Sequence, residues 1–222
     1  MADPRWRTLQ IADSAFPTGG FAHSAGLEAA ASAGAVPPSH ALEAYVRAHL
    51  WNVGSSALPF AAAAHDDPAQ VWPLDALADA RLTSHVANRA SRTQGRAFLS
   101  TVAAVFDDAG VRELAQRARS GDASVHLAPV FGAVLSLLGV ERSDALAVFL
   151  LLSLRGVASA AVRLGIVGPH ESQRIQTGLA ATLDAVLSEC ERLPPSRAAG
   201  TSPISDLLGA THDRLHAHLF QS

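Results

Sequence analysis

Apolar residues recur at helical spacing along most of the chain. Between residues 73 and 107, for example, Leu74, Leu77 and Ala78 follow the i, i+3, i+4 spacing of one helix face. No run of useful length alternates between apolar and polar positions with the period of a strand. The pattern therefore predicts an all-α fold.

Proline, glycine and small polar residues separate the predicted helices. Gly139 and Gly165 follow two of them, as glycine commonly does after a helix C-terminus, and Ser143 is expected to cap the helix that begins there. A short charged helix is expected between Gly110 and Gly121. Together these signals predict one bundle of roughly eight to ten helices. The other expected helices span residues 23–33, 39–52, 55–65, 73–107, 125–139, 143–164 and 170–191.

The last part of the chain has a different composition. Residues 196–202 are small and polar and are typical of a flexible linker. The sequence therefore divides into an all-α core domain, residues 1–195, and a linker with a tethered C-terminal segment, residues 196–222. We expect this segment to dock on a partner.

The tethered segment carries its own apolar stripe. Leu208, Leu215 and Leu219 fall at i, i+7 and i+11 within an amphipathic piece over residues 203–220. Such a stripe must be buried, either against its own domain or against another protein. Capture by a partner is the hypothesis carried forward here.

The helical pattern is interrupted most sharply at residues 9–28, LQIADSAFPTGGFAHSAGLE, which we call the opening motif. Pro17 fixes its own φ, and two glycines follow it, at which we expect conformations or contacts that a side chain would block. Phe16 and Phe21 flank the turn. From the residues alone this is a corner between two helices with a packing phenylalanine on each side.

Composition excludes several functional classes. All 17 basic residues are arginine, so lysine-based covalent catalysis and a phosphate-binding P-loop are both excluded. The net charge of −3, without a basic block, does not support nucleic-acid binding. The single Cys190 rules out an internal disulfide framework and fits a reducing cytoplasm. The most apolar run, residues 145–154, is too short for a membrane span and is expected to be a buried core helix.

Histidine is the abundant chemically active residue, with 10 copies. His212 and His216 are four residues apart, a spacing that on a helix places two imidazoles where they can hold nickel. No third ligand is in line, so they are weak metal candidates, and the alternative is an exposed polar face. A stand-alone metal-binding protein remains the second functional hypothesis.

The arginines of the expected helix 73–107 form a further candidate site. Arg89, Arg92 and Arg96 lie at i, i+3 and i+7, from which they can clasp a carboxylate or phosphate. The alternative is a solvated, ion-paired face. We find no paired carboxylates, no activated nucleophile and no cofactor loop, so the chain is not expected to be an enzyme. A small helical enzyme is therefore only the third functional hypothesis.

The chain resembles the urease accessory protein F family in several motifs that occur in the family's order. The opening motif, the helix with Arg89-Ala90-Ser91 and Gly95-Arg96, and the stretch from Ser159 to Gly165 are all similar to it. His126 with Phe131-Gly132, and the tail with His212-Asp213 and Leu219-Phe220, are similar too. The chain departs from the family pattern at His23, Gly156, His218 and Gln221.

The resemblance implies a fold, a function and a set of partners. It implies an all-α, dimeric, cytoplasmic chaperone that bridges the D-type (H-type) accessory protein and the nickel-carrying G-type GTPase. That assembly docks on urease apoprotein and regulates GTP-dependent nickel insertion. The resemblance implies no cofactor of the chain's own, since nickel is handled by the assembly. It also implies no nucleic acid and no membrane as a partner.

The motifs of the resemblance also yield the residues that are expected to bind partners. These are Phe16, Pro17, Gly19, Gly20, Phe21, His23, Ser24, Gly26, Glu28, Arg89, Arg96, Arg163, Gln173, His212, Leu219 and Phe220.

Overall fold

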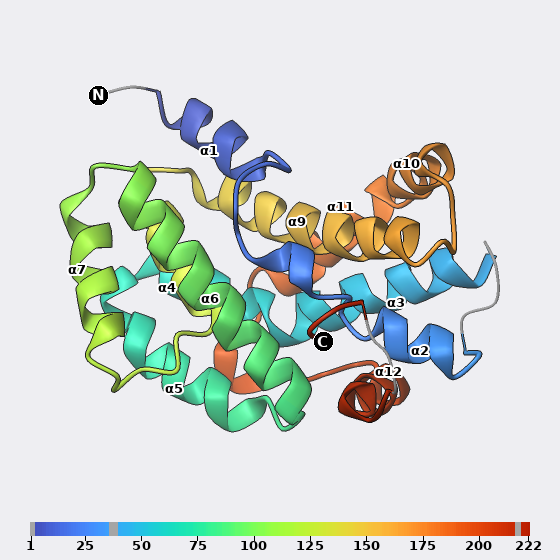
Figure 1. The fold of residues 1–222 in the computed structure, drawn as a ribbon. Helices are drawn as coiled ribbons and strands as arrows, with labels where there is room; N and C mark the ends of the chain where they lie inside the picture. Colours follow the sequence, from blue (N-terminus) through green and yellow to red (C-terminus); the bar gives the residue numbers. More distant parts are fainter. Residues whose placement is uncertain (1–2, 36–39, 216–218) are drawn as a thin grey trace.

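A computed structural model describes residues 3–35, 40–215 and 219–222, and it is helical throughout (Figure 1). Its described part holds twelve α-helices and no strand, so the all-α prediction is confirmed. The helices are α1 (Pro4–Ala12), α2 (Leu27–Ser32), α3 (His40–Ser56), α4 (Leu58–Asp66), α5 (Val71–Arg81), α6 (His85–Val105), α7 (Ala109–Arg119), α8 (Leu127–Leu137), α9 (Arg142–Arg163), α10 (Pro169–Gly178), α11 (Ala180–Cys190) and α12 (Pro203–Ala210).

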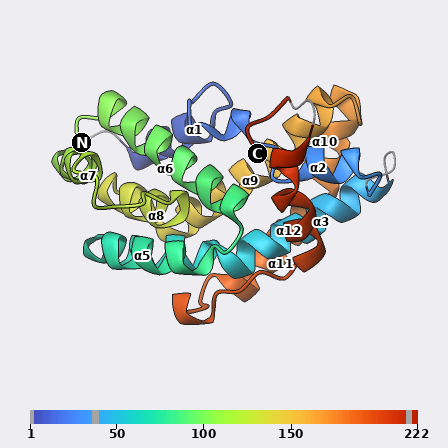
Figure 2. The same ribbon diagram turned by 60° about the horizontal axis from the view of Figure 1, so that its bottom comes forward.

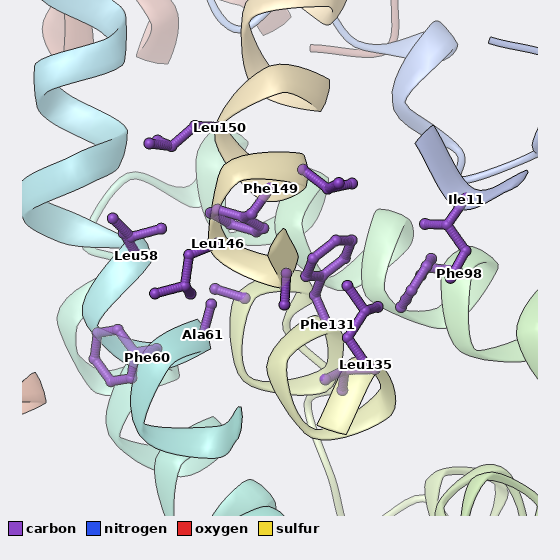
Figure 3. Close-up of a cluster of buried hydrophobic side chains, with 14 of the residues drawn as sticks. Ile11, Leu58, Phe60, Ala61, Phe98, Phe131, Leu135, Leu146, Phe149 and Leu150 are labelled. Atoms are coloured by element: carbon purple, nitrogen blue, oxygen red, sulfur yellow. The ribbon is translucent and has the colours of Figure 1, made fainter. Parts of the chain in front are cut away.

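The core is built around α9 and α8, which supply many of its buried side chains. Phe98 of α6, Phe131 of α8 and Phe149 of α9 stack in a row, with ring centroids 5.1 and 5.3 Å apart (Figure 3). Helix α4 packs so closely on α8 that a Cβ at Gly132 would strike the backbone of Ala61. A glycine at this crossing lets the two helix backbones touch.

Helix α9 explains the longest apolar run of the sequence. By length and composition it is long enough to cross a membrane, but 56% of its apolar window is buried inside the protein. Helices α3, α4, α8, α10 and α11 all pack against it, and Figure 2 shows it enclosed between the others. The expectation of a buried core helix is therefore confirmed.

Two of the expected helices are each divided in two. The range 73–107 breaks after Arg81, where Ser84 caps α6 by accepting a hydrogen bond from the Ala87 amide. The range 170–191 breaks at Leu179, whose fully buried side chain anchors the corner between α10 and α11. Both breaks raise the number of helices above the expected eight to ten.

Two further expectations at helix ends are corrected. Helix α9 begins at Arg142 with Glu141 as its N-cap, so Ser143 lies inside the first turn and does not cap it. Helix α12 ends at Ala210, and residues 212–214 continue as a single 3₁₀ turn. Leu208, Leu215 and Leu219 therefore do not share one helical stripe.

The segment between α11 and α12 contacts the helices around it. The amide of Thr201 donates to the side chain of Asn52, and the guanidinium of Arg81 donates to the carbonyl oxygens of Ser196 and Ala198. Figure 1 shows the chain returning from here to α12, which lies beside α2. That residues 196–222 act as a separate docking segment stays a prediction.

Candidate functional site: a clasp between the opening motif and the tail

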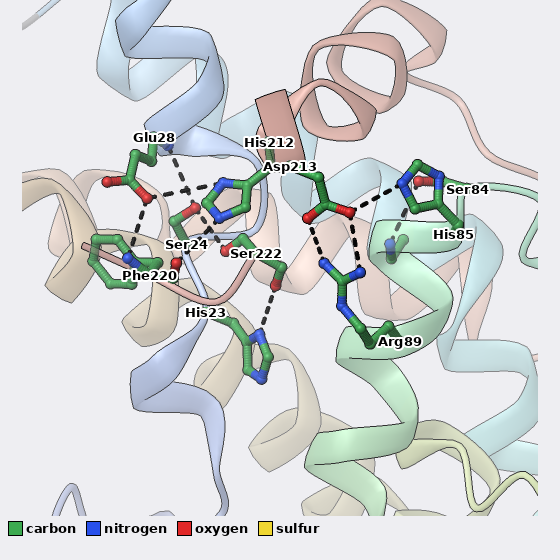
Figure 4. A network of polar contacts seen from close by, with 11 residues as sticks. His23, Ser24, Glu28, Ser84, His85, Arg89, His212, Asp213, Phe220 and Ser222 are labelled. Carbon is green, nitrogen blue, oxygen red and sulfur yellow. Dashed lines mark hydrogen bonds and ion pairs between the residues drawn. The ribbon is translucent and has the colours of Figure 1, made fainter. Parts of the chain in front are cut away.

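The opening motif and the C-terminal tail meet in one site, although nearly 200 residues separate them. We call it the clasp, and define it as residues 19–28 with the described tail residues 212–215 and 219–222. Figure 4 shows the polar contacts that join the two segments. Arg89 of α6 and Arg163 of α9 complete the site from either side.

Glu28, in the first turn of α2, anchors the tail backbone. Its two carboxylate oxygens accept hydrogen bonds from the amides of Leu219, at 2.5 Å, and Phe220, at 3.2 Å (Figure 4). The His212 ring lies 3.8 Å from the same carboxylate. Its Nε2 donates a hydrogen bond to the Phe220 carbonyl oxygen at 3.1 Å. Charge-assisted bonds of this kind are about twice as strong as neutral ones.

His23 and Ser24 hold the next part of the tail. The Ser24 amide and hydroxyl both donate to the carbonyl oxygen of Ser222, at 2.6 and 2.9 Å. The Ser222 hydroxyl lies 2.5 Å from the His23 Nδ1, and the Gln221 amide donates to the Ala22 carbonyl at 2.8 Å. The tail thus pairs with the opening motif as a short extended segment.

Burial and nearby charge make His23 a neutral imidazole. The pKa of His23 is lowered first by burial and then by the positive charges of Arg89 and His212. Its Nε2 is buried and has no hydrogen-bond partner among the residues that the structure describes. A proton placed there would have no acceptor and would face like charge, so the clasp favours the uncharged ring.

Arg163 stacks between two phenylalanines, one from each half of the clasp. Its guanidinium carbon lies 3.8 Å from the Phe21 ring centroid and 4.2 Å from that of Phe220. The guanidinium also donates to the carbonyl oxygen of Phe21. Phe220 is buried, whereas the side chains of Phe21 and Leu219 are 72% and 52% exposed. The site therefore presents apolar surface to solvent at its edge.

Two glycines shape the opening motif. Gly19 and Gly26 have φ of 78° and 80°, the left-handed region, and a Cβ at Gly26 would lie 3.3 Å from Gly209 of α12. Gly20 has neither restriction, because the nearest atom to its Cβ would be the Thr18 hydroxyl at 3.6 Å. The expectation of a blocked side chain thus holds for Gly19 and is wrong for Gly20.

Several predicted site residues lie around the clasp or away from it. Phe16 is buried and stacks on Phe106, and the carbonyl of Pro17 accepts from Thr101 of α6, so both fix the loop. Arg96 is exposed on α6 beyond Arg89, and Gln173 is exposed on α10. The structure therefore brings most, but not all, of the predicted residues together.

The metal candidates differ from the expected geometry. His212 lies in the 3₁₀ turn after α12 and is buried in the clasp, so it is not on an exposed helix face. His216 lies outside the described residues. Among the residues that the structure describes, no group of three or more metal-ligating side chains is placed to hold an ion.

Sequence reasoning missed Asp213 as a site residue. Its carboxylate accepts two hydrogen bonds from the Arg89 guanidinium, at 2.6 and 3.1 Å, and lies 3.2 Å from the His85 ring (Figure 4). The hydrogen bonds from Arg89 lower the pKa of Asp213 to about 2. The sequence did offer one signal for this contact, because Asp213 in the tail and Arg89 on α6 carry opposite charges.

A network of Ser91 and Asp79 around the buried His126 was also missed. The Ser91 hydroxyl lies 3.0 Å from one nitrogen of the His126 ring, and the other nitrogen lies 3.0 Å from the Asp79 carboxylate. The Ser91 oxygen also accepts from the Leu127 amide. These bonds tie α5, α6 and the start of α8 together, which gives the network a structural role.

A cavity of about 310 Å³ lies behind the clasp. His23, Tyr45, His49 and Phe98 are among the residues that line it. His49 makes a 2.9 Å hydrogen bond with the Ser153 hydroxyl, and burial lowers the pKa of His49 to about 4. Burial also raises the pKa of Tyr45, and its hydroxyl donates to the Ala25 carbonyl.

Comparison with known proteins agrees with the motifs that form the clasp. The family model described as UreF matches residues 36–180. A urease accessory protein F from Arabidopsis thaliana is 37% identical over 222 residues, which cover 98% of this chain and 92% of that protein. The chain belongs to the UreF family of urease accessory proteins.

Relatives in other organisms carry the same name. A urease accessory protein F from Oryza sativa subsp. japonica is 36% identical over 97% of this chain and 84% of that protein. A urease accessory protein UreF from Mycobacterium tuberculosis is 33% identical over 96% of this chain and 97% of that protein. Members of the UreF family are named as accessory factors to urease, not as enzymes, and this chain has an accessory role in urease maturation.

Proposed function

We propose that this UreF family member is an adaptor in urease maturation. It bridges the D-type (H-type) accessory protein and the nickel-carrying G-type GTPase, and the assembly docks on urease apoprotein and regulates GTP-dependent nickel insertion. Nickel is the cargo of the assembly, and the adaptor needs no cofactor of its own. It acts in the cytoplasm and as a homodimer within the complex.

One observation supports this proposal above the others. The opening motif and the tail, which are the two ends of the family resemblance, form a single surface, and two exposed apolar side chains stand on it. Phe21 and Leu219 are both more than half exposed although their neighbours Arg163 and Phe220 are packed together. Exposed apolar groups beside an ordered polar frame are typical of a protein-binding site. We assign this surface to the D-type protein.

Capture of the purified D-type protein tests the assignment. Leu219→Ala and Phe21→Ala each remove an exposed side chain, so we expect each to weaken capture by about tenfold. The melting temperature should stay unchanged in Leu219→Ala and fall slightly in Phe21→Ala, which also removes a ring that stacks on Arg163. The matched control is Val105→Ala, which removes a 49% exposed side chain at the end of α6. Capture that is equal in all four proteins would contradict the assignment.

The second functional hypothesis, a stand-alone metal-binding protein, gains no support from the geometry. His212 is engaged with Glu28 and the Phe220 carbonyl inside the clasp. Nickel titration of the purified chain separates the two hypotheses, because a tight site that is lost in His212→Ala would favour metal binding.

A further inference from the structure

Three arginines on one face of α6 form a surface strip beside the clasp. We call Arg89, Arg92 and Arg96 the arginine strip. Residues three and four apart are neighbours on a helix surface, and seven residues of helix extend about 10 Å. Together with Asn88 and Thr93 the strip lines a surface hollow of about 600 Å³.

The first position of the strip already holds a carboxylate. Asp213 sits on the Arg89 guanidinium through two hydrogen bonds, at 2.6 and 3.1 Å. Because the pKa of Asp213 is lowered to about 2 by this contact, the group is ionised at any physiological pH. Paired contacts of this kind match the planar fork of arginine to the two oxygens of a carboxylate. The chain itself therefore shows which anion the strip accepts.

The other two positions have no anion. Within the part of the chain that the structure describes, no hydrogen bond or ion pair engages the guanidinium of Arg92 or Arg96. The Nε of Arg92 is even buried without a partner. Like charges at this spacing repel each other, and an unpaired buried donor is costly. The repulsion is relieved when an anion binds to the guanidinium groups.

We infer that the arginine strip is a docking surface for an acidic segment of a partner protein, with Asp213 as an internal occupant of its first position. The strip is about 10 Å long, which suits successive carboxylate side chains better than one phosphate group. The inference deepens the proposed function and rests on it, because an adaptor must hold partners. It concerns a surface separate from Phe21 and Leu219.

A peptide of alternating glutamate and glycine is the first probe. We expect Arg92→Gln/Arg96→Gln to weaken its binding by about tenfold, since two charge pairs with the peptide are lost. Asp213→Asn is expected to strengthen binding, because it frees a third guanidinium. The matched control, Arg119→Gln/Arg192→Gln, removes the same charge from α7 and from the residue after Glu191, where both side chains are exposed.

Peptide binding that weakens in Arg92→Gln/Arg96→Gln and strengthens in Asp213→Asn cannot be explained by a loss of stability in both variants. Equal binding by the strip variant and its control would overturn the inference, as would weaker binding by Asp213→Asn. Inorganic phosphate that displaces the peptide at equal concentration would show a phosphate site and would also overturn it. If the glutamine variant does not fold, Arg96→Gln alone carries the same test, since Arg96 is exposed.

Capture experiments distinguish this inference from the proposed function. The wild-type chain is mixed with the D-type protein, the GTPase and urease apoprotein, and capture is followed with increasing salt. We expect the strip variant to lose one of the three partners and to retain the others. If wild type captures all three and the strip variant does so equally at every salt concentration, the adaptor function stands and the inference fails. If wild type captures none, the proposed function itself fails.

Discussion

Individual residues of the clasp show how much the site depends on backbone conformation. Ala25, which follows Ser24, has φ of 53°, and Gly26 comes next with φ of 80°. Two consecutive left-handed residues turn the chain so that Ser24 faces Ser222 while Glu28 faces the amides of Leu219 and Phe220. The polar contacts therefore rest on a turn that few residues can adopt.

The first prediction compares two glycines of the opening motif. Gly26→Ala should lower the free energy of unfolding by about 1–2 kcal/mol, because alanine is strained in the left-handed region, and its Cβ would also press on Gly209. Gly20→Ala should cost little, since its Cβ would only make an ordinary contact with the Thr18 hydroxyl at 3.6 Å. Urea unfolding of both variants measures the difference. Equal costs would mean that the turn at Gly26 relaxes freely.

The ends of helices were predictable from the sequence where local residues determine them, and were not predictable where tertiary contacts determine them. The glycine after α8 and the proline at the first position of α12 mark real helix ends, since they act within a few residues. The break at Leu179 was missed although Gly178 precedes it, because a single glycine is also tolerated inside a helix; only the structure shows that the Leu179 side chain is buried in the bundle at this corner. The tail fails for a similar reason: its leucines have helical spacing, but contacts with Glu28 hold residues 219–220 in another conformation.

The candidate site was predictable in its parts but not as a whole. The opening motif and the tail each carry recognisable residues, so both were selected from the sequence. Their contact spans about 190 positions of the chain, and no local pattern indicates which Glu28 oxygen meets which amide. Asp213 was missed for the same reason, because its partner Arg89 lies on another helix.

The second prediction concerns the tail as an element. Phe220→Ala should lower the free energy of unfolding by about 3 kcal/mol, because a buried aromatic ring is removed. Leu219→Ala, next to it but exposed, should change stability by less than about 0.5 kcal/mol. Thermal unfolding of the two variants tests this. Similar melting temperatures for both would show that the tail is not held in the clasp in solution, and would favour its capture by a partner.

The molecule as a whole is expected to lose stability in mild acid. The pKa of His49 is lowered to about 4 and that of His23 is lowered too, while an unfolded histidine titrates near 6.5. Between these values the unfolded chain binds more protons than the folded one. The free energy of unfolding therefore falls as the pH decreases from about 6.5 towards 4, by up to about 1.4 kcal/mol per pH unit for each histidine.

Replacement of His49 isolates its share of this pH dependence. His49→Gln keeps a side chain that can bond with the Ser153 hydroxyl but does not titrate. Its unfolding free energy should depend less steeply on pH than that of the wild type over the same window. His170→Gln, on the exposed first turn of α10, is the control. A slope that is the same in all three proteins would contradict a neutral His49.

Because the two halves of the clasp are far apart in the sequence, the ribosome synthesises them at different times. Glu28 and its partner amide at Phe220 are 192 residues apart. At the usual rates of synthesis the ribosome needs about 10–40 s to cover that distance. During this interval the nascent chain contains Ser24 and Glu28 but not the amides and carbonyl that they hold later. The opening motif is thus made well before the tail residues that complete its contacts.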